Sequence, residues 1–279
     1  MAKRWTLRKL PPGVNALLVG AVLFAGVYLL PPDTSLQLVE ESGLLRVCAP
    51  ASRPPLVTGD PQNPGFDISV LQEIARRMNV KFAVNVNSAM GRDFNPRNWR
   101  LTRAQCEVVA GGVLTSTTTR SFLEVLSTGI ASGWVLIARD ASKIEQGEAI
   151  GVYPGFSGLD RVTLSSYLRG LGARVSLSKS ADELARSLTA GEVDAAVAGS
   201  LDAEQIIEAD PSLKMTWLPA SLGRYDFGIG LWKGDLTLKR KILEIYEQLD
   251  REGFIAAQRE HYGLVAEAPP DAPDDQTLQ

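Results

Sequence analysis

The sequence predicts an α/β fold with parallel strands. Short apolar segments alternate with amphipathic helical segments in two stretches, 45–86 and 149–198, and each contains the order strand, helix, strand. This order places consecutive strands in parallel in one sheet, with helices packed on its faces. The 279 residues, of which 45% are hydrophobic and 22% charged, are enough for two compact domains or one large one.

The first stretch begins with a short apolar strand over 45–50. Three prolines within and after this strand force the chain into an extended loop. Apolar residues recur at helical spacing over 68–78, and Asp67 is placed to cap the amino end of that helix. Residues 80–86 alternate between apolar and polar side chains, which indicates the second strand of the unit.

The second stretch repeats this order, and further elements follow it. Its first helix starts from a glycine-bearing loop, 154–158, and its second helix follows Ser180, which suits an N-cap. A long helix near the end has apolar residues along one side. The predicted elements are strands over 133–139, 149–153, 174–177, 193–198 and 225–232, and helices over 159–171, 181–190 and 236–251, with a short helix that ends at Tyr262.

A buried strand is also predicted over 106–111, and it leads into a loop rich in hydroxyl groups. In an open α/β sheet, ligands bind at the carboxyl ends of the strands. Thr115 and Thr117 offer hydroxyls at this place, and Arg120 offers a planar set of donors that suits a carboxylate. We interpret the segment as an anion clamp. The alternative is a polar surface loop with one solvated arginine.

The two ends of the chain differ from the body in composition. Basic residues in the first nine positions precede an uncharged apolar run over 14–30. For residues 1–32 this pattern predicts a cytoplasmic basic end and a transmembrane signal anchor, with the body on the periplasmic side of the membrane. The alternative is a cleaved signal peptide and a body secreted to the periplasm. Residues 265–279, rich in proline and aspartate, are predicted to form a disordered tail.

The chain has two cysteines, Cys48 and Cys106, and both fall on predicted strands of one sheet. Exported proteins form and keep disulfides because their compartment is oxidising. We therefore predict a disulfide between these cysteines, which requires that the two strands be neighbours. Two buried free thiols are the alternative.

Several motifs, in their order and spacing, resemble the type 3 bacterial extracellular solute-binding proteins, which bind polar amino acids for ABC importers. The resemblance covers about residues 45 to 263. The motifs are Leu-Arg-Val with Pro54-Pro55 downstream, Gly65-Phe66-Asp67, Thr115-x-Thr117-x-x-Arg120 followed by Ser127, Gly151-Val-Tyr-Pro-Gly155-Phe-Ser157, Gly191-Glu-Val-Asp-Ala195, and Gly228 with Lys233-Gly-Asp235.

The resemblance implies a two-lobed periplasmic-binding-protein fold of type II, in which two α/β lobes are joined by two crossing strands. Lobe 1 would comprise residues 45–131 and 225–264, and lobe 2 would comprise residues 132–224. A ligand would bind in the cleft between the lobes, which would close on it by a hinge motion.

The resemblance also implies roles for particular residues. Arg120 falls where the family's arginine holds the ligand's α-carboxylate, with Thr115 and Thr117 nearby. Ser157 falls in a second-lobe loop at a helix start that contacts the same group. The free N–H groups and positive dipole end of such a helix start favour an anion independently. Phe156, in the same loop, would cover an apolar part of the ligand.

The sequence departs from the family pattern at several ligand-contacting positions. Gly199 stands where the family usually has an aspartate for the ligand's amino group, and Asp202 is either a substitute or a solvated surface residue. Leu56 replaces an aromatic residue after the proline pair, and Arg53 stands near the usual site of another. A further arginine without the aspartate suits a more negatively charged ligand that lacks an ammonium group, such as an organic acid or an acidic sugar.

Composition and motifs favour a binding protein over an enzyme. The net charge of −3 gives no basic surface for nucleic acid. The only histidine, His261, completes no convincing Ser/His/Asp set, and two cysteines are too few for a zinc cluster, so no catalytic residue, metal or cofactor is expected. The expected partners are a small carboxylate ligand, an ABC permease or other membrane partner, and the inner membrane through the N-terminal segment. The alternative role is that of a membrane-tethered sensing or accessory protein.

Overall fold

The computed structural model describes residues 17, 19–22, 32–90, 96–139, 143–155 and 158–264. The chain divides into two units, 1–34 and 35–279, and the fold below is that of the second unit. Apart from Leu17 and 19–22, the predicted membrane segment lies outside the described residues, as does the predicted tail. None of the helices in the described part is long and apolar enough to cross a bilayer.

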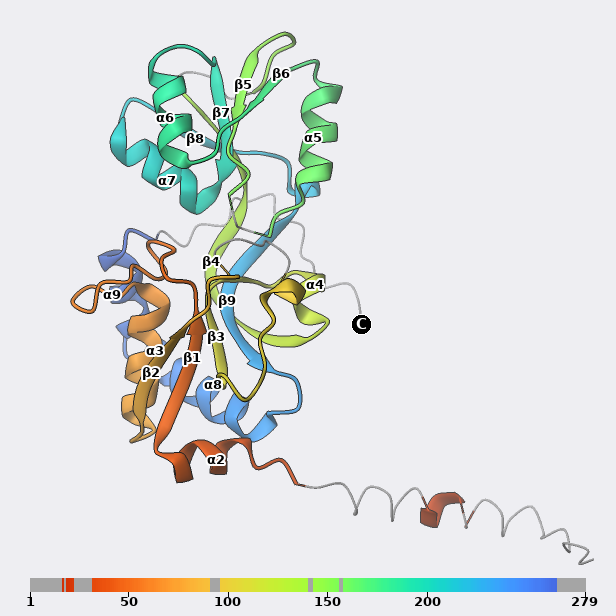
Figure 1. The fold of residues 1–279 in the computed structure, drawn as a ribbon, viewed down its shortest axis with the longest axis vertical. Coiled ribbons are helices and arrows are strands. Elements are labelled where there is room, and N and C mark those ends of the chain that lie inside the picture. Colours follow the sequence, from red (N-terminus) through yellow and green to blue (C-terminus); the bar gives the residue numbers. More distant parts are fainter. Residues whose placement is uncertain are drawn as a thin grey trace, which may run out of the picture. The chain divides into compact units, whose positions relative to one another are not determined.

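Among the described residues, the second unit contains a nine-stranded mixed sheet (Figure 1). Its strands follow the order β2-β1-β3-β9-β4-β7-β5-β6, and β8 pairs with β4. The strands β1 and β2 are parallel, as are β5 and β6, so each predicted strand–helix–strand unit forms a parallel section. The bounds are β1 (Leu44–Ala49), β2 (Lys81–Val86), β3 (Val108–Leu114), β4 (Leu123–Ala138), β5 (Ala149–Val152), β6 (Arg174–Leu177), β7 (Ala195–Gly199), β8 (Lys214–Trp217) and β9 (Arg224–Trp232).

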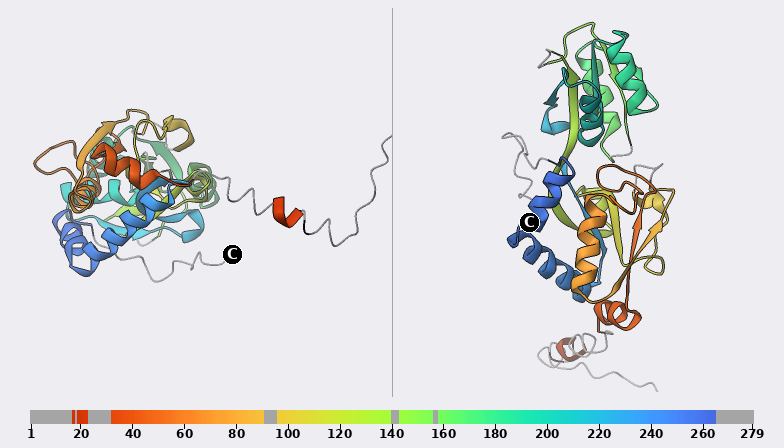
Figure 2. Two further views of the ribbon diagram at one scale, coloured as in Figure 1. Left: turned by 90° about the horizontal axis from the view of Figure 1, so that it is seen from below. Right: turned by 90° about the vertical axis from the view of Figure 1, so that its left-hand side faces the viewer.

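The helices follow the predicted periodicity closely. Helix α8 has the predicted bounds, and the apolar residues along one side of it are buried. Burial of one such side chain contributes about 1.5–3 kcal/mol, which explains why this stripe determines how the helix packs. Helices α3, α8 and α9 contact one another (Figure 2). The helices are α2 (Ser35–Ser42), α3 (Phe66–Arg77), α4 (Thr117–Arg120), α5 (Arg161–Gly170), α6 (Ala181–Thr189), α7 (Ser200–Ala209), α8 (Leu236–Arg251) and α9 (Phe254–His261), with 3-10 turns η1 (Pro96–Trp99) and η2 (Ala220–Leu222).

Strands β4 and β9 connect the two parallel sections. Residues 123–133 of β4 pair with β9, and residues 134–138 pair with β7 and β8. The chain therefore leaves one section along β4 and returns to it along β9 (Figure 1). We call the section with β1–β3 the first lobe and the section with β5–β8 the second lobe. The predicted strand over 133–139 is only the second part of β4, because irregular pairing between Ser127 and Ile130 interrupts the apolar pattern of the first part.

Two details at the helix starts differ from the sequence prediction. Helix α3 begins at Phe66 with Gly65 as its N-cap, so the prediction that Asp67 caps this helix is wrong. The Asp67 carboxylate accepts a hydrogen bond from the N–H of Gly111 instead (2.8 Å). Helix α7 was not predicted, and it begins directly after β7 with Gly199 at its cap. By contrast, Ser180 caps α6 as predicted.

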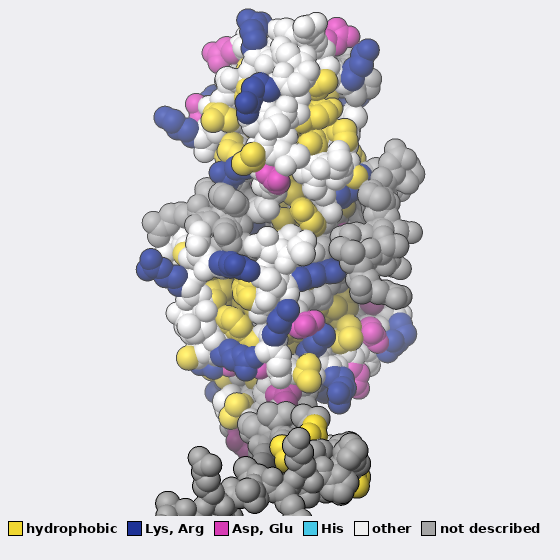
Figure 3. All heavy atoms as spheres, turned by 90° about the vertical axis from the view of Figure 1, so that its right-hand side faces the viewer, with side chains coloured by type: hydrophobic (Ala, Val, Ile, Leu, Met, Phe, Trp, Pro, Cys, Tyr) yellow, Lys and Arg dark blue, Asp and Glu magenta, His cyan; other side chains and the backbone are white. Residues whose placement is uncertain are grey.

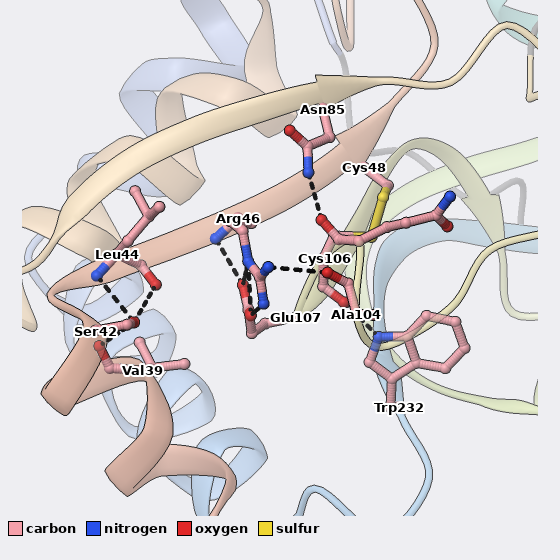
Figure 4. Close-up of polar contacts among 11 residues, drawn as sticks. Val39, Ser42, Leu44, Arg46, Cys48, Asn85, Ala104, Cys106, Glu107 and Trp232 are labelled. Atoms are coloured by element: carbon pink, nitrogen blue, oxygen red, sulfur yellow. Dashed lines mark hydrogen bonds and ion pairs between the residues drawn. A yellow bond between two sulfur atoms is a disulfide. The ribbon is translucent and has the colours of Figure 1, made fainter.

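The predicted disulfide between Cys48 and Cys106 is present (Figure 4). Cys48 lies on β1, and Cys106 lies just before β3, which is the parallel neighbour of β1. Their Cα atoms are 5.6 Å apart, and both side chains are buried. No free cysteine remains, which excludes the alternative of two buried thiols.

Polar contacts surround the disulfide and fix the segment that precedes β3 (Figure 4). Arg46 of β1 forms an ion pair with Glu107 and donates a hydrogen bond to the carbonyl of Ala104 (2.9 Å). The indole N–H of Trp232, on β9, donates to the carbonyl of Cys106 (2.7 Å). The disulfide and these contacts together join the segment to strands on both sides of it.

The face of the molecule in Figure 3 carries Lys and Arg side chains with Asp and Glu side chains among them. The described side chains visible there form no continuous basic stripe.

Candidate functional site

A cavity of about 190 Å³ lies between the two lobes. The first lobe contributes the loop after β1 and a bulge in β3, and the second lobe contributes Tyr153 after β5 and part of α7. The cavity therefore lies at the carboxyl ends of parallel strands, where α/β proteins bind ligands. Six lining residues matter below: Arg53, Trp99, Gly111, Gly112, Tyr153 and Asp202.

Arg53 is held by the loop that follows β1. Its N–H donates to the carbonyl of Val57 (2.6 Å), and the N–H of Val57 donates back to the carbonyl of Arg53 (3.0 Å). This pair of bonds closes a tight turn, and the prolines within the turn restrict its backbone further. Gly112 lies beside the arginine, since a Cβ there would be 3.8 Å from Cγ and Nε of Arg53. The loop therefore holds the arginine side chain along the cavity wall.

Asp202 lies in the first turn of α7. The hydroxyl of Ser200 donates to the carbonyl of Ala131 on β4 (3.1 Å), which anchors the start of this helix to a crossing strand. Gly155 packs against the carboxylate: it has φ +54°, and a Cβ there would lie 2.6 Å from Oδ2 of Asp202. Asp202 is only 7% exposed, so it is not the solvated surface residue that was one alternative for it.

Arg53 and Asp202 meet across the cavity as an ion pair between the lobes. Nη1 of Arg53 is 3.3 Å from Oδ1 of Asp202, and the two side chains are 12% and 10% exposed. Nη2 of Arg53 and Oδ2 of Asp202 are also buried, and neither has a hydrogen-bond partner among the described residues. Each charged group therefore retains one unused bonding atom, although buried polar groups usually have partners.

Burial determines the electrostatics of this pair. Loss of solvent raises the pKa of Asp202, and the charge and hydrogen bond of Arg53 act in the opposite direction. Burial also raises the pKa of Tyr153, and the charge of Asp202 raises it further. Tyr153 therefore lies close enough to Asp202 for the two groups to interact electrostatically, and its hydroxyl stays protonated at neutral pH. Among the described residues that line the cavity, Arg53 is the cation, Asp202 is the anion and Tyr153 is the phenol donor.

Trp99 and Met90 form an apolar part of the cavity wall. Both belong to the buried cluster that contains the disulfide, and Trp99 is 4% exposed. The segment that carries Trp99 ends at Cys106, so the disulfide connects this wall to β1. The cavity therefore combines a charged pair on one side with a covalently tethered apolar wall on another.

The predicted clamp residues on the first lobe lie elsewhere. The hydroxyl of Thr115 accepts a hydrogen bond from the N–H of Asp226 (3.0 Å), and this joins β3 to β9. Thr117 and Arg120 are the first and last residues of α4, and both are exposed. None of these three clamp residues lines the cavity.

The charge of Arg120 acts outside the cavity. The pKa of Glu124 is lowered, chiefly by its hydrogen bond to Lys239, and Arg120 is one of the smaller contributors. The structure thus brings Arg53 and Asp202 together and leaves Arg120 apart from them. The assignment of Arg120 as the carboxylate clamp stays a prediction. Ser157 and Phe156 lie outside the described residues.

Gln205 is a cavity residue that sequence reasoning missed. It lies three residues after Asp202 on α7, so the two side chains share one helix face. That spacing would have identified Gln205 if α7 had been predicted. Within the described residues, no group of His, Cys, Asp and Glu is arranged to hold a metal ion.

Comparison with solved structures finds proteins with the same fold. A mutant of ArgBP from T. maritima aligns at a TM-score of 0.60 and 21% identity, over 82% of this chain and 99% of that one. An ancestral cationic amino acid solute-binding protein aligns at a TM-score of 0.64 and 19% identity, over 82% and 99%. A substrate-binding protein of an ABC uptake transporter from Streptococcus pneumoniae, with bound histidine, aligns at 0.61 and 15% identity, over 82% and 96%.

No protein-family model matches the sequence, and no curated protein matches it. The likeness to solved structures shows the fold: the chain has the two-lobed α/β fold that these solute-binding proteins share. The resemblance inferred from the sequence motifs is confirmed at this level. An ancestral amino-acid-binding protein with this fold is described as a precursor of cyclohexadienyl dehydratase. The fold alone therefore does not separate binding from catalysis.

Proposed function

We propose that the chain is an extracytoplasmic solute-binding protein that captures a small carboxylate-bearing ligand between its lobes for an ABC importer. The observation that carries this proposal is the Arg53–Asp202 pair. Its two members come from different lobes, face one cavity, and each retain a buried polar atom without a partner among the described residues. A ligand that bonds to both atoms would hold the lobes together, which is how a solute-binding protein traps its solute.

The pair favours a ligand that carries both a carboxylate and an ammonium group, such as an amino acid. The carboxylate would bind Arg53 through two parallel hydrogen bonds, and the ammonium would bind Asp202, so no charge would be left unpaired. An organic acid or acidic sugar would place a second negative charge beside Asp202. Leaving a buried charge unpaired costs about 3–5 kcal/mol. Asp202 thus supplies the acidic group that Gly199 lacks.

Two further observations support this proposal. The similar solved structures include a cationic amino acid solute-binding protein and a protein with bound histidine. Amino acids of both kinds carry an α-ammonium group and an α-carboxylate. The disulfide fits an oxidising compartment. We accordingly propose that the body lies on the periplasmic side of the cytoplasmic membrane and that its partner is a membrane permease. The proposed tether through the N-terminal apolar run rests on the sequence pattern alone.

A ligand screen by thermal unfolding tests the proposed function. At least one of the twenty L-amino acids is expected to stabilise the purified protein, by about 2.7 kcal/mol at a concentration one hundred times its dissociation constant. Asp202→Asn, which retains the shape of the side chain, is expected to lose this response. Stabilisation by dicarboxylic and uronic acids alone would contradict the amino-acid assignment. Absence of any response in all three ligand classes would contradict the binding function.

A further inference from the structure

Asp67 is a buried acidic residue next to the cavity. It has no part in the proposed binding of the ligand's charges by Arg53 and Asp202. It is 0% exposed and lies in the first turn of α3. Its Oδ2 accepts a hydrogen bond from the N–H of Gly111 (2.8 Å). Its Oδ1 is buried and has no partner within the described part of the chain. Burial of a carboxyl group without a complete set of hydrogen-bond partners is unfavourable, which makes a specific role for Asp67 worth seeking.

The contacts of Asp67 join two segments of the cavity wall. Its backbone N–H donates to the carbonyl of Leu56 (3.1 Å), within the turn that carries Arg53. Its carboxylate holds Gly111, in the bulge of β3. Gly111 and Gly112 have φ values of +87° and +98°, a region that favours glycine, and the bond from Asp67 restrains the first of these flexible residues. One residue therefore holds both segments that flank the arginine side chain.

We propose that Asp67 is a positioning residue of the ligand site. By joining the turn over 53–57 to the Gly111–Gly112 bulge, it fixes the direction in which the Arg53 guanidinium points. This inference rests on the proposed function for its effect on affinity. Its structural part, that the carboxylate orders the bulge, stands independently of any ligand.

The surroundings of Asp67 give this role a pH dependence. Burial raises the pKa of Asp67 to about 7, although the N–H groups of Gly111 and Gly112 act to lower it. The charged and titratable groups that helices α8 and α9 bring near Asp67 include Tyr246 and Arg259, and the charges of Arg259 and Asp67 both affect the pKa of Tyr246. The hydroxyl of Tyr262 accepts from the N–H of Gly65 and bonds to the hydroxyl of Ser69, so a further titratable side chain lies beside the start of α3.

The two consequences of this ionisation have opposite signs. Because the folded pKa is raised, the contribution of the neutral carboxyl to stability is lost as pH rises through about 7. The hydrogen bond from Gly111 is stronger to a carboxylate than to a carboxyl group, so the bulge becomes better ordered over the same range. Affinity should therefore rise between pH 6 and pH 8 while stability falls. If Asp67 had only a structural role, affinity and stability would change in the same direction between pH 6 and pH 8.

Asp67→Asn tests the inference, since asparagine retains an acceptor for Gly111 but cannot ionise. Hydrogen exchange of the Gly111 amide, compared at one pH near 8, is expected to be about tenfold faster in this variant, and the change should be confined to 53–57 and 108–114. The best-binding L-amino acid of the screen should bind about five- to tenfold more weakly at pH 8, and its affinity should no longer change between pH 6 and pH 8.

Thr128→Val is the matched control. Thr128 is buried, and its hydroxyl donates to the carbonyl of Phe227 (2.8 Å), so the substitution removes one buried hydrogen bond away from the cavity. This variant is expected to lose stability and keep the pH profile of binding. Unchanged exchange at Gly111 in Asp67→Asn would overturn the inference whether or not a ligand binds. Failure of every amino acid to bind the wild-type protein would overturn the proposed function instead.

Discussion

Arg53→Ala is expected to weaken binding of the best amino acid of the screen by about 2–5 kcal/mol, which is roughly thirtyfold to several thousandfold. The expected loss is large because the side chain is nearly buried and is paired with Asp202. Its removal takes away the donors for the ligand carboxylate. It also leaves Asp202 without its partner, which favours the protonated form of this carboxyl and weakens its hold on an ammonium group. Calorimetric titration of the purified variant measures this loss.

Arg120→Ala is the matched control for that experiment. Both substitutions remove one arginine, but Arg120 is exposed and lies outside the cavity lining. If Arg53 and not Arg120 holds the ligand carboxylate, this removal is expected to change affinity by less than about threefold, as is usual for an exposed charge. The clamp predicted from the sequence requires the reverse order. If Arg120→Ala abolished binding and Arg53→Ala did not, the arginine would be misassigned, and the Arg53–Asp202 pair would only hold the lobes together.

Removal of the disulfide is expected to have the largest effect on stability. The bond closes a loop between cysteines that are 58 positions apart, and the loss of chain entropy in the unfolded state predicts a contribution of about 4 kcal/mol for a loop of this size. The bond also tethers the segment that carries Trp99 to β1. Reduction should therefore loosen one wall of the cavity as well as destabilise the fold.

Urea unfolding with and without a reductant measures this contribution. The wild-type protein should unfold at a lower urea concentration when reduced, with a difference of about 4 kcal/mol. The control is the Cys48→Ser/Cys106→Ser variant, which should be as unstable as the reduced protein and should not respond to the reductant. Equal stability of the wild-type protein in both conditions would contradict the predicted contribution of the bond to the free energy of unfolding.

Local patterns were sufficient to predict most of the fold. The stripe of α8 and the cap of α6 by Ser180 depend on residues within a few positions of each other, and both have the predicted structure. The disulfide was predictable because two strands of one sheet carried the only cysteines. Helix α7 was missed because it begins at Ser200, directly after the last residue of β7, so no loop in the sequence marks its start.

The candidate site was less predictable because it depends on contacts between distant segments. Arg53 and Asp202 are 149 positions apart, and they meet only because β4 and β9 place the loop after β1 opposite the start of α7. No local pattern contains that information. Asp67 is a similar case: its position before a helical stripe suits an N-cap, but its carboxylate bonds to Gly111 on β3. In both cases a polar residue was assigned from its neighbours in sequence, and its partner lies elsewhere.

The most direct measurement compares three ligands that differ by one group each. These are the best-binding L-amino acid, the carboxylic acid that lacks its amino group, and the amine that lacks its carboxylate. If Arg53 and Asp202 bind the two charges of one ligand, titration calorimetry should show tight binding of the amino acid only, with both analogues weaker by at least about one hundredfold, or roughly 2.7 kcal/mol. Binding of the deaminated acid as tightly as the amino acid would contradict this assignment.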